Sequence, residues 1–228
     1  MDSRTCGIIL AAGIGARMGA NVTKQKINIL GRSVLHYALA AFEACHDIDD
    51  VVLVVRSDEF DFARREADGM LKVCSIVAGG CCRAESAAKG FAAIPSDTGI
   101  VAVHDAARAL IRPEEISIVI AEAKKTGAAT AVSLVTDTIK TVDELGVVTG
   151  TVNRETLRKA QTPQAFSVQV YKKALENVVD YGLITDDNMM VEQIGVAISA
   201  VDVGDENIKL TTPADLRYAE FLLKERGF

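Results

Sequence analysis

The sequence predicts an α/β protein with a Rossmann-like, mostly parallel sheet flanked by helices. Two observations predict it. Short apolar runs alternate with helical patterns along the whole chain, as in a parallel sheet that is covered on both faces. The length of 228 residues suits one domain with a large core, and no linker or internal repeat divides it. We therefore expect a single domain over residues 1–228.

The elements follow from that alternation. The expected strands are the apolar runs Cys6–Leu10, Val51–Val55, Val73–Val77, Ile100–His104, Thr130–Val135 and Ala197–Val203. The expected helices are Val34–Cys45, Asp58–Leu71, Arg83–Ile94, Pro113–Thr126, Val168–Tyr181, Asp186–Gly195 and Pro213–Arg226. Pro113 and Pro213 suit a first helical turn, where the missing N–H of proline has no helical partner to lose.

One segment breaks the alternation and predicts a β-hairpin. Ile139–Val142 and Val147–Val152 flank a short loop that contains Gly146. An isolated hairpin is marginal in water unless it packs on something. Either a partner subunit covers this arm, at about residues 137–154, or the arm lies on its own domain.

Composition excludes several classes of protein. With 49% hydrophobic residues and a formal charge of -6, the chain is expected to be globular and soluble, and the acidic balance argues against a nucleic-acid partner. No signal peptide and no apolar run of about 18 residues is present, so we expect no membrane partner and a cytoplasmic location. The odd number of cysteines without zinc-like spacing favours reduced thiols, and a redox role is weighed only for the adjacent pair Cys81-Cys82.

The stretch Cys6–Lys26 carries the first chemical signal. An apolar strand runs into a loop of small residues, Ala11 to Gly15, whose backbone N–H groups can approach phosphate oxygens closely. The cations Arg17, Lys24 and Lys26 follow and suit a triphosphate. An ordinary glycine-rich turn is the alternative.

Two familiar phosphate motifs do not fit this loop. A Walker A loop has the pattern G-x-x-x-x-G-K-[ST], so a second glycine must stand five residues after the first. Met18 stands five residues after Gly13, and Ala20 stands five residues after Gly15. A Rossmann fingerprint requires a third glycine where Met18 stands.

Two further loops are expected at the same edge of the sheet, because ligands bind beyond the carboxyl ends of parallel strands. In Ala78–Ser86, Gly79 and Gly80 allow close backbone approach, and Arg83 and Ser86 are candidates to contact the triphosphate and base. A solvated first helical turn is the alternative for Arg83.

The segment Val101–Arg108 ends a strand in His104 and Asp105. An acid at this position can hold Mg²⁺ through an oxygen, and Arg108 can clamp a phosphate. Asp105 as a helix N-cap is the alternative. We expect His104 to be a packed strand residue and not a catalyst.

The order of motifs resembles a known family. Leu10 to Met18 followed by Lys24-Gln25 is similar to the signature of nucleotidyltransferases that act on phosphorylated sugars or polyols. The full set of segments resembles 2-C-methyl-D-erythritol 4-phosphate cytidylyltransferase over nearly the whole chain: LAAGIGARM, TKQK, GG-x-x-R-x-x-S, VHDAAR, DTIK, Thr151-Val152-Asn153-Arg154, QTPQAF, Ile184-Thr185-Asp186 and ENIKLTTPADL.

The resemblance implies an enzyme of the non-mevalonate route to isoprenoid precursors. It would join CTP to 2-C-methyl-D-erythritol 4-phosphate, release pyrophosphate, require Mg²⁺ and work as a homodimer joined by the projecting hairpin arm. Because Arg154 follows the hairpin, it could reach into the site of the neighbouring subunit.

The resemblance also implies roles for individual residues. Those of catalysis are Arg17, Lys24, Arg154 and Lys209; those that hold the nucleotide are Ala11, Ala12, Gly13, Gly15, Gly80, Arg83 and Ser86. Those around the polyol phosphate are Asp105, Arg108, Thr138, Arg154, Thr162, Thr185 and Lys209, with Asp105 also the metal ligand.

Several positions depart from the family pattern, and two rival functions are weighed. The departures are Thr23, Cys81, Ala109 and Glu206, and they put the stiffness of the lysine loop and the detail of the nucleotide pocket in doubt. Ribitol-5-phosphate cytidylyltransferase is the nearer rival, although Ala12 and Ala107 favour methylerythritol phosphate. A non-catalytic CTP-binding dimer is the other, and the intact Arg17, Lys24, Asp105 and Lys209 argue against it.

Overall fold

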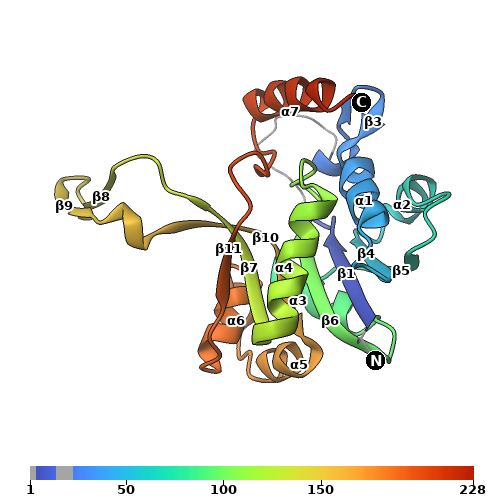
Figure 1. The fold of residues 1–228 in the computed structure, drawn as a ribbon, viewed down its shortest axis with the longest axis horizontal. Helices are drawn as coiled ribbons and strands as arrows, with labels where there is room; N and C mark the ends of the chain where they lie inside the picture. Colours follow the sequence, from blue (N-terminus) through green and yellow to red (C-terminus); the bar gives the residue numbers. More distant parts are fainter. Residues whose placement is uncertain (1–3, 14–22) are drawn as a thin grey trace.

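A seven-stranded sheet organises the computed structural model, which describes residues 4–13 and 23–228 (Figure 1). The strand order is β11-β7-β10-β6-β1-β4-β5. These strands are β1 (Arg4–Leu10), β4 (Asp50–Val55), β5 (Val73–Ala78), β6 (Thr98–Asp105), β7 (Ala128–Leu134), β10 (Arg158–Ser167) and β11 (Ser199–Asp202). All neighbours pair in parallel except β10, which is antiparallel to β6 and β7. The predicted mostly parallel α/β fold is confirmed.

Helices cover both faces of this sheet. They are α1 (Val34–Ala44), α2 (Phe60–Glu66), α3 (Arg83–Phe91), α4 (Pro113–Thr126), α5 (Val168–Glu176), α6 (Asp187–Gln193) and α7 (Pro213–Glu225). Successive residues of a strand point to opposite faces, so Ile9 belongs to the core cluster that includes residues of α1, α2 and α4, whereas Ile8 belongs to the cluster that includes residues of α3, α5 and α6. Burial on both faces explains why β1 and β4 are apolar without alternation.

The C-terminal helix α7 covers the edge of the molecule beside α1. Its Leu222 and Leu223 pack against Ile29 and Tyr37, near the short antiparallel pair of β2 (Asn28–Ile29) and β3 (Arg32–Ser33). Within residues 4–13 and 23–228, no helix is both long and apolar enough to cross a membrane.

Strand β10 was not among the predicted strands. Its sequence contains Pro163, which cannot donate to a ladder and normally argues against a central strand. The pairing with β7 shifts register between Ala160 and Gln164, so Pro163 lies in a bulge, and the Thr162–Pro163 peptide bond is cis. Pairing resumes at Gln164 against both neighbours.

Two predicted helices end five residues earlier than expected. The helix expected over Asp58–Leu71 is α2, Phe60–Glu66, and the chain turns at Gly69, whose φ is 78°. The helix expected over Val168–Tyr181 ends at Glu176, and Tyr181–Leu183 forms a separate 3-10 helix.

The predicted hairpin is present and extends away from the main sheet (Figure 1). β8 (Ile139–Val142) pairs antiparallel with β9 (Val148–Val152), and Asp143 Oδ1 accepts from the backbone N–H groups of Leu145 and Val147 in the loop. Leu145 and Val148 stay 88% and 59% exposed. The alternative in which the hairpin packs on its own domain is therefore wrong.

Candidate active site

The carboxyl ends of β1, β5 and β6 open into a cleft of about 420 Å³. This is the edge at which parallel α/β sheets bind ligands. The described residues that line it are Leu10, Ala12, Gly13, Lys24, Gln25, Gly80, Cys81, Cys82, Arg83, Ser86, Asp105, Ala107 and Lys209. Segments far apart in the sequence thus converge here, as the sequence predicted for Lys24, Asp105 and Lys209.

Gln25 ties the lysine loop to the end of β1. Its side chain is buried, and Nε2 donates to the backbone oxygens of Ala11 and Gly13. Lys24 begins the 3-10 helix that carries Gln25, so its backbone is anchored beside the loop of small residues. The sequence matched Gln25 to a motif but assigned it no role. The predicted site residues Gly15 and Arg17 lie outside the described part of the chain.

Thr23 and Lys26 hold the other side of the lysine loop. The Thr23 hydroxyl donates to Glu59 Oε1 at 2.7 Å, and Lys26 Nζ lies 3.0 Å from the same oxygen. Glu59 is only 3% exposed. Thr23 therefore supplies a hydrogen bond to the body of the protein at the position where the family commonly has proline.

Gly79 lets the loop over residues 78–86, the second loop of the cleft, approach the loop of small residues after β1, the first loop. A Cβ at this position would lie 2.5 Å from the Cβ of Ala12 and 2.9 Å from Ser86 Oγ, closer than real contacts allow. The next residue, Gly80, donates its backbone N–H to Ser86 Oγ at 2.9 Å, and Ser86 donates to Cys82 O. The predicted nucleotide residues Ala12, Gly80 and Ser86 therefore form one packed wall of the cleft.

Asp105 sits between two cations in the cleft. Its Oδ1 accepts from Arg83 Nε at 2.9 Å and its Oδ2 accepts from Lys209 Nζ at 2.6 Å. Burial alone would raise the pKa of Asp105, but the charges of Arg83 and Lys209 hold it well below its usual range. Asp105 ends β6 and is not a helix N-cap, since α4 begins at Pro113 with Arg112 as its N-cap.

Asp187 is a second carboxylate that sequence reasoning missed. It is fully buried at the start of α6, where Oδ2 accepts from Arg83 Nη1 at 2.6 Å and Oδ1 accepts from the Tyr171 hydroxyl at 2.5 Å. Burial lowers the pKa of Arg83, but Asp187 and Asp105 outweigh it and raise that pKa. The available signal was the doubled acid directly after Thr185, of which only Asp186 was matched to a motif.

The two glutamines of β10, Gln161 and Gln164, hold the start of α6 and the loop that carries Lys209. Gln164 Oε1 accepts from the backbone N–H groups of Asp187 and Asn188 at 2.9 and 3.2 Å, which fixes the start of α6. Asn207 Nδ2 donates to Gln161 Oε1 and to Thr162 O, both at 2.8 Å. Because Asn207 is two residues before Lys209, β10 also positions the loop that carries this lysine.

His104 and Thr162 hold the backbone of Asp105. Burial lowers the pKa of His104 to about 4, so the ring is neutral near pH 7. A ring nitrogen facing a carbonyl must donate, so Nε2–H donates to Arg108 O and Nδ1 accepts from the Thr162 hydroxyl. Thr162 Oγ1 in turn accepts from Asp105 N at 3.1 Å. His104 is fully buried and packed, as predicted.

Comparisons with known proteins agree with this geometry. The family model for 2-C-methyl-D-erythritol 4-phosphate cytidylyltransferase matches residues 5–225. The chain belongs to this family. A relative from Desulforamulus reducens with that name is 39% identical over 224 residues, covering 96% of each chain. One from Clostridium perfringens is 38% identical, covering 97% of this chain and 99% of its own.

Solved structures of the cytidylyltransferase family have the same fold. The 4-diphosphocytidyl-2C-methyl-D-erythritol synthase of Anaerococcus prevotii superposes with a TM-score of 0.86 at 28% identity, covering 97% of this chain and 96% of its own. The 2-C-methyl-D-erythritol 4-phosphate cytidylyltransferase of Thermus thermophilus gives a TM-score of 0.77 at 28% identity, covering 98% and 100%.

The remaining residues that the cytidylyltransferase resemblance assigned to the polyol phosphate do not line this cleft of the described chain. Arg108 donates to the backbone oxygens of Asn207 and Ala160 at 2.8 and 3.1 Å, which braces the loop that carries Lys209. Thr185 is exposed before α6, and Thr162 is buried beneath Asp105. Thr138 and Arg154 lie at the two ends of the hairpin arm, where Arg154 Nη1 donates to Thr136 O at 2.5 Å.

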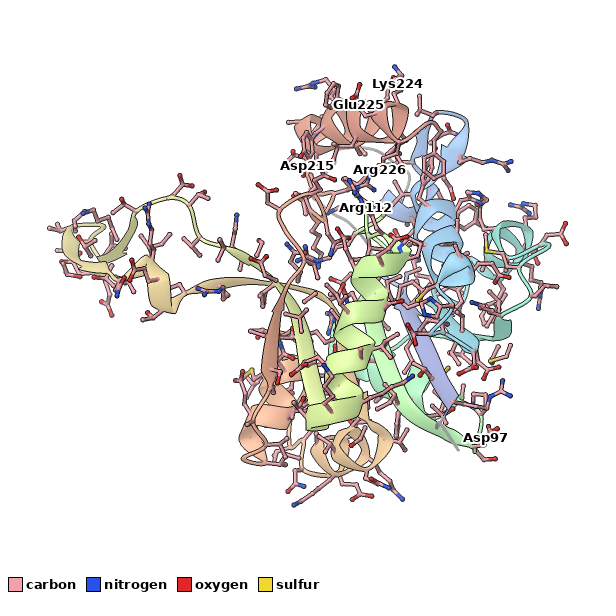
Figure 2. All side chains as sticks on the ribbon, viewed as in Figure 1. Asp97, Arg112, Asp215, Lys224, Glu225 and Arg226 are labelled. Atoms are coloured by element: carbon pink, nitrogen blue, oxygen red, sulfur yellow. The ribbon has the colours of Figure 1, made fainter. Side chains whose placement is uncertain are left out.

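Glu206, where the cytidylyltransferases often have Asp, joins the Lys209 loop to two helices. Its Oε2 accepts from Arg112 Nη2 at 2.5 Å and from Arg226 Nη2 at 2.8 Å. The two arginines, labelled in Figure 2, follow the end of α7 and precede the start of α4, and they meet at this one oxygen. The two charge-assisted bonds show that the longer acid still anchors this loop.

The donor chemistry at Asp105 fits the Mg²⁺ that the cytidylyltransferase resemblance implies. The carboxylate is ionised, it borders the cleft, and each oxygen keeps lone-pair capacity beyond its one N–H donor. Mg²⁺ binds through one or two carboxylates together with water and phosphate oxygens. Asp105 can therefore supply the protein ligand of a magnesium–triphosphate complex.

Proposed function

We propose that the chain transfers the cytidylyl group of CTP to 2-C-methyl-D-erythritol 4-phosphate, giving 4-diphosphocytidyl-2-C-methyl-D-erythritol and pyrophosphate. The observation that carries the proposal is the convergence of Lys24, Asp105 and Lys209 on one cleft in a chain that matches the family over residues 5–225. A doubly wound sheet alone hosts many functions, so the site and not the fold decides.

The chemistry is an attack of the substrate phosphate on the α-phosphorus of CTP. A phosphate monoester carries about 1.5 to 2 negative charges near pH 7, so it needs no general base but must approach another anion. Lys24 and Lys209 line the cleft from different segments of the chain and would offset that repulsion while the attacking and leaving oxygens align. Arg17 is proposed to act with them.

The first and second loops would hold the nucleotide. Ala12, Gly13 and Gly15 would present backbone N–H groups, and Gly80 and Ser86 would face the base and ribose. Ala11 is buried and its N–H already donates to Val54 O at 2.7 Å, so it would support this loop from beneath the nucleotide. Arg83 is already bound to Asp105 and Asp187, so its main effect would be to fix Asp105. Its Nη2 is buried without a partner in the described chain and is available to a ligand oxygen.

Mg²⁺ held by Asp105 would neutralise phosphate charge and orient the triphosphate when bound. Our proposal places the enzyme in the cytoplasm, and all five cysteines are free thiols, the usual state of thiols there.

The polyol phosphate would be held by groups from two subunits. Lys209, Arg108 and Thr185 lie on the body of one chain, and the buried Thr162 would act there from beneath Asp105. Thr138 and Arg154 lie on the arm that extends away from that body. We propose a homodimer in which the arm places Arg154 beside the substrate of the neighbouring subunit. The exposed apolar side chains of Val142, Leu145, Val147 and Val148 support burial of the arm in such an interface.

A pyrophosphate-release assay tests the reaction. The protein is incubated with Mg²⁺, with each of the four nucleoside triphosphates in turn, and with either methylerythritol phosphate or ribitol phosphate. We expect the combination of CTP and methylerythritol phosphate to dominate. Dominance of ribitol phosphate would reassign the substrate, and no release with any combination would leave only a nucleotide-binding role.

A further inference from the structure

Two thiols and a carboxylate meet on the loop that opens α3. Cys81 Sγ, Cys82 Sγ and a carboxylate oxygen of Glu85 all lie within 4.8 Å of one another. A zinc ion takes thiolate ligands at about 2.3 Å and carboxylate oxygens at about 2.0–2.2 Å. Small side-chain rotations would therefore bring the three atoms onto one ion. This cluster is invisible in the cysteine spacing of the sequence, because the third ligand is Glu85.

The backbone around these ligands is already fixed. Glu85 Oε2 accepts from Cys81 N at 2.7 Å, and Cys82 Sγ accepts from Glu85 N at 3.4 Å as the N-cap of α3. Supporting contacts of this kind orient the ligands of protein metal sites.

We propose that Cys81, Cys82 and Glu85 form a binding site for a thiol-preferring divalent cation of the zinc class. Sulfur ligands select zinc over magnesium, which takes oxygen ligands, so this site would differ from the one at Asp105. Each thiol that coordinates releases its proton to solvent. Three protein ligands leave a fourth tetrahedral position for water or another ligand.

The position of the site links it to the cleft. Cys81 and Cys82 line the cleft, and Gly80 and Ser86 of the same loop form its wall. Lys89 Nζ lies 3.1 Å from Glu85 Oε1 and balances part of the charge that a carboxylate and two thiolates would concentrate there. A bound zinc ion would therefore hold this wall in place. The proposed metal site does not depend on the proposed reaction, so the two are tested independently.

Cobalt provides the direct test, because Co²⁺ bound by thiolates gives a sulfur-to-metal absorption band in the near ultraviolet. The reduced full-length protein is titrated with Co²⁺ in excess Mg²⁺. We expect one Co²⁺ per chain with a thiolate band that Zn²⁺ abolishes. Loss of a partner that only supports a metal ligand weakens metal binding by about 10- to 100-fold. Cys81→Ser and Cys82→Ser should each weaken Co²⁺ binding by more than that. Glu85→Gln should weaken binding and keep a thiolate band.

Cys74 is the matched control, since it is an exposed thiol on β5 that is not one of the three ligands. Cys74→Ser should leave the cobalt titration unchanged. The proposal is overturned if the unmodified protein gives no thiolate band at one equivalent, or if the band persists when Cys81 and Cys82 are both serine. Loss of the band in Cys74→Ser would overturn it as well.

Alkylation of the unmodified protein gives a second readout that does not depend on a variant folding. One equivalent of Zn²⁺ should protect Cys81 and Cys82 from iodoacetamide, with the labelled peptides identified by mass spectrometry. Cys74 should be labelled equally with and without Zn²⁺. Equal labelling of all three thiols in both conditions would contradict the site.

Discussion

Arg83 Nη1 donates to Asp187 Oδ2 at 2.6 Å, and Asp187 is completely buried. The same guanidinium donates from Nε to Asp105 Oδ1 at 2.9 Å. One arginine therefore joins a buried carboxylate on α6 to the carboxylate that borders the cleft. Asp187 is in this sense a positioning residue: it holds Arg83, and Arg83 orients Asp105.

Asp187→Asn should destabilise the protein more than its small change in shape suggests. Removing one partner of a buried ion pair costs about 3–5 kcal/mol, because the other charge stays buried. Tyr171→Phe is the matched control, since it removes only a hydrogen bond to the same carboxylate, and should cost about 1–3 kcal/mol. Urea denaturation measures both. A loss in Asp187→Asn no larger than that in Tyr171→Phe would argue against a stabilising role for the Arg83–Asp187 pair.

Lys24→Ala should lower kcat by about 100-fold or more with folding intact, as expected when one pre-placed charge at a developing anion is lost. Lys26→Ala is the control, because Lys26 lies on the same 3-10 helix but is not among the residues that line the cleft. We expect kcat to change only a few-fold there. Steady-state pyrophosphate release compares the two variants. Near-normal turnover in Lys24→Ala, or equal losses in both, would remove Lys24 from the mechanism.

Stability should fall on mild acidification because of His104. Its pKa is about 4 in the folded chain, against the ordinary histidine value of 6.5 in an unfolded chain, so the unfolded state takes up a proton at higher pH than the folded state does. The contribution of His104 to stability is complete above about pH 6.5 and is lost progressively as the pH falls to about 4. Between about pH 7 and about pH 5, the free energy of unfolding should fall by about 2 kcal/mol.

Urea denaturation at about pH 7 and about pH 5, on the unmodified protein and on His104→Gln, isolates the contribution of His104. The variant should be less stable near pH 7 but should lose about 2 kcal/mol less on acidification. An identical pH dependence in both proteins would show that His104 does not carry it. Because pyrophosphate release is not measured, the result is independent of catalysis.

Gly79→Ala should weaken CTP binding more than it weakens folding. The added Cβ would press on Ala12 and Ser86, which form the wall of the cleft. Gly7→Ala is the contrasting variant, because its Cβ would meet the buried Phe42 ring 2.5 Å away within the core. We expect a raised KM for CTP in the first variant and a lowered denaturation midpoint in the second. A lowered denaturation midpoint with an unchanged KM for CTP in Gly79→Ala would show that the close contact at Gly79 serves folding and not nucleotide binding.

The sequence predicted most of this architecture because burial on both faces of a parallel sheet leaves uninterrupted apolar runs. Runs such as Val51–Val55 are typical of strands that are buried on both faces. The same rule could not find β10, whose sequence is polar and contains Pro163. That strand is held by partners that lie far away in the sequence, such as Asn207 against Gln161, and local patterns carry no such information.

The site was predictable to the extent that it consists of loops after strands. Gly80, Asp105 and Lys24 follow from that position and from the motif, whereas the contacts among them do not. Asp187 shows the limit, because nothing in its neighbourhood indicates an ion pair with a residue 104 positions earlier. Gln25 shows the same limit in a short-range form: its role lies in the backbone atoms that it contacts.

Arg154→Ala should impair use of the polyol phosphate and leave CTP binding nearly unchanged, since Arg154 lies on the arm and not in the cleft of its own chain. Calorimetry with CTP and with methylerythritol phosphate separates the two. Equal weakening of both ligands would contradict a substrate-side role.

Mixed dimers decide whether Arg154 acts across the subunit interface. Arg154→Ala and Lys24→Ala chains are co-expressed with different tags, and the doubly tagged dimer is purified. If Arg154 serves the neighbouring cleft, one site of this dimer has both defects and the other has none, so the dimer should regain about half of the activity of the unmodified dimer. If Arg154 serves its own cleft, each site keeps one defect and the mixed dimer stays as inactive as its parents. Failure of the two chains to associate would remove the dimer itself from the proposal.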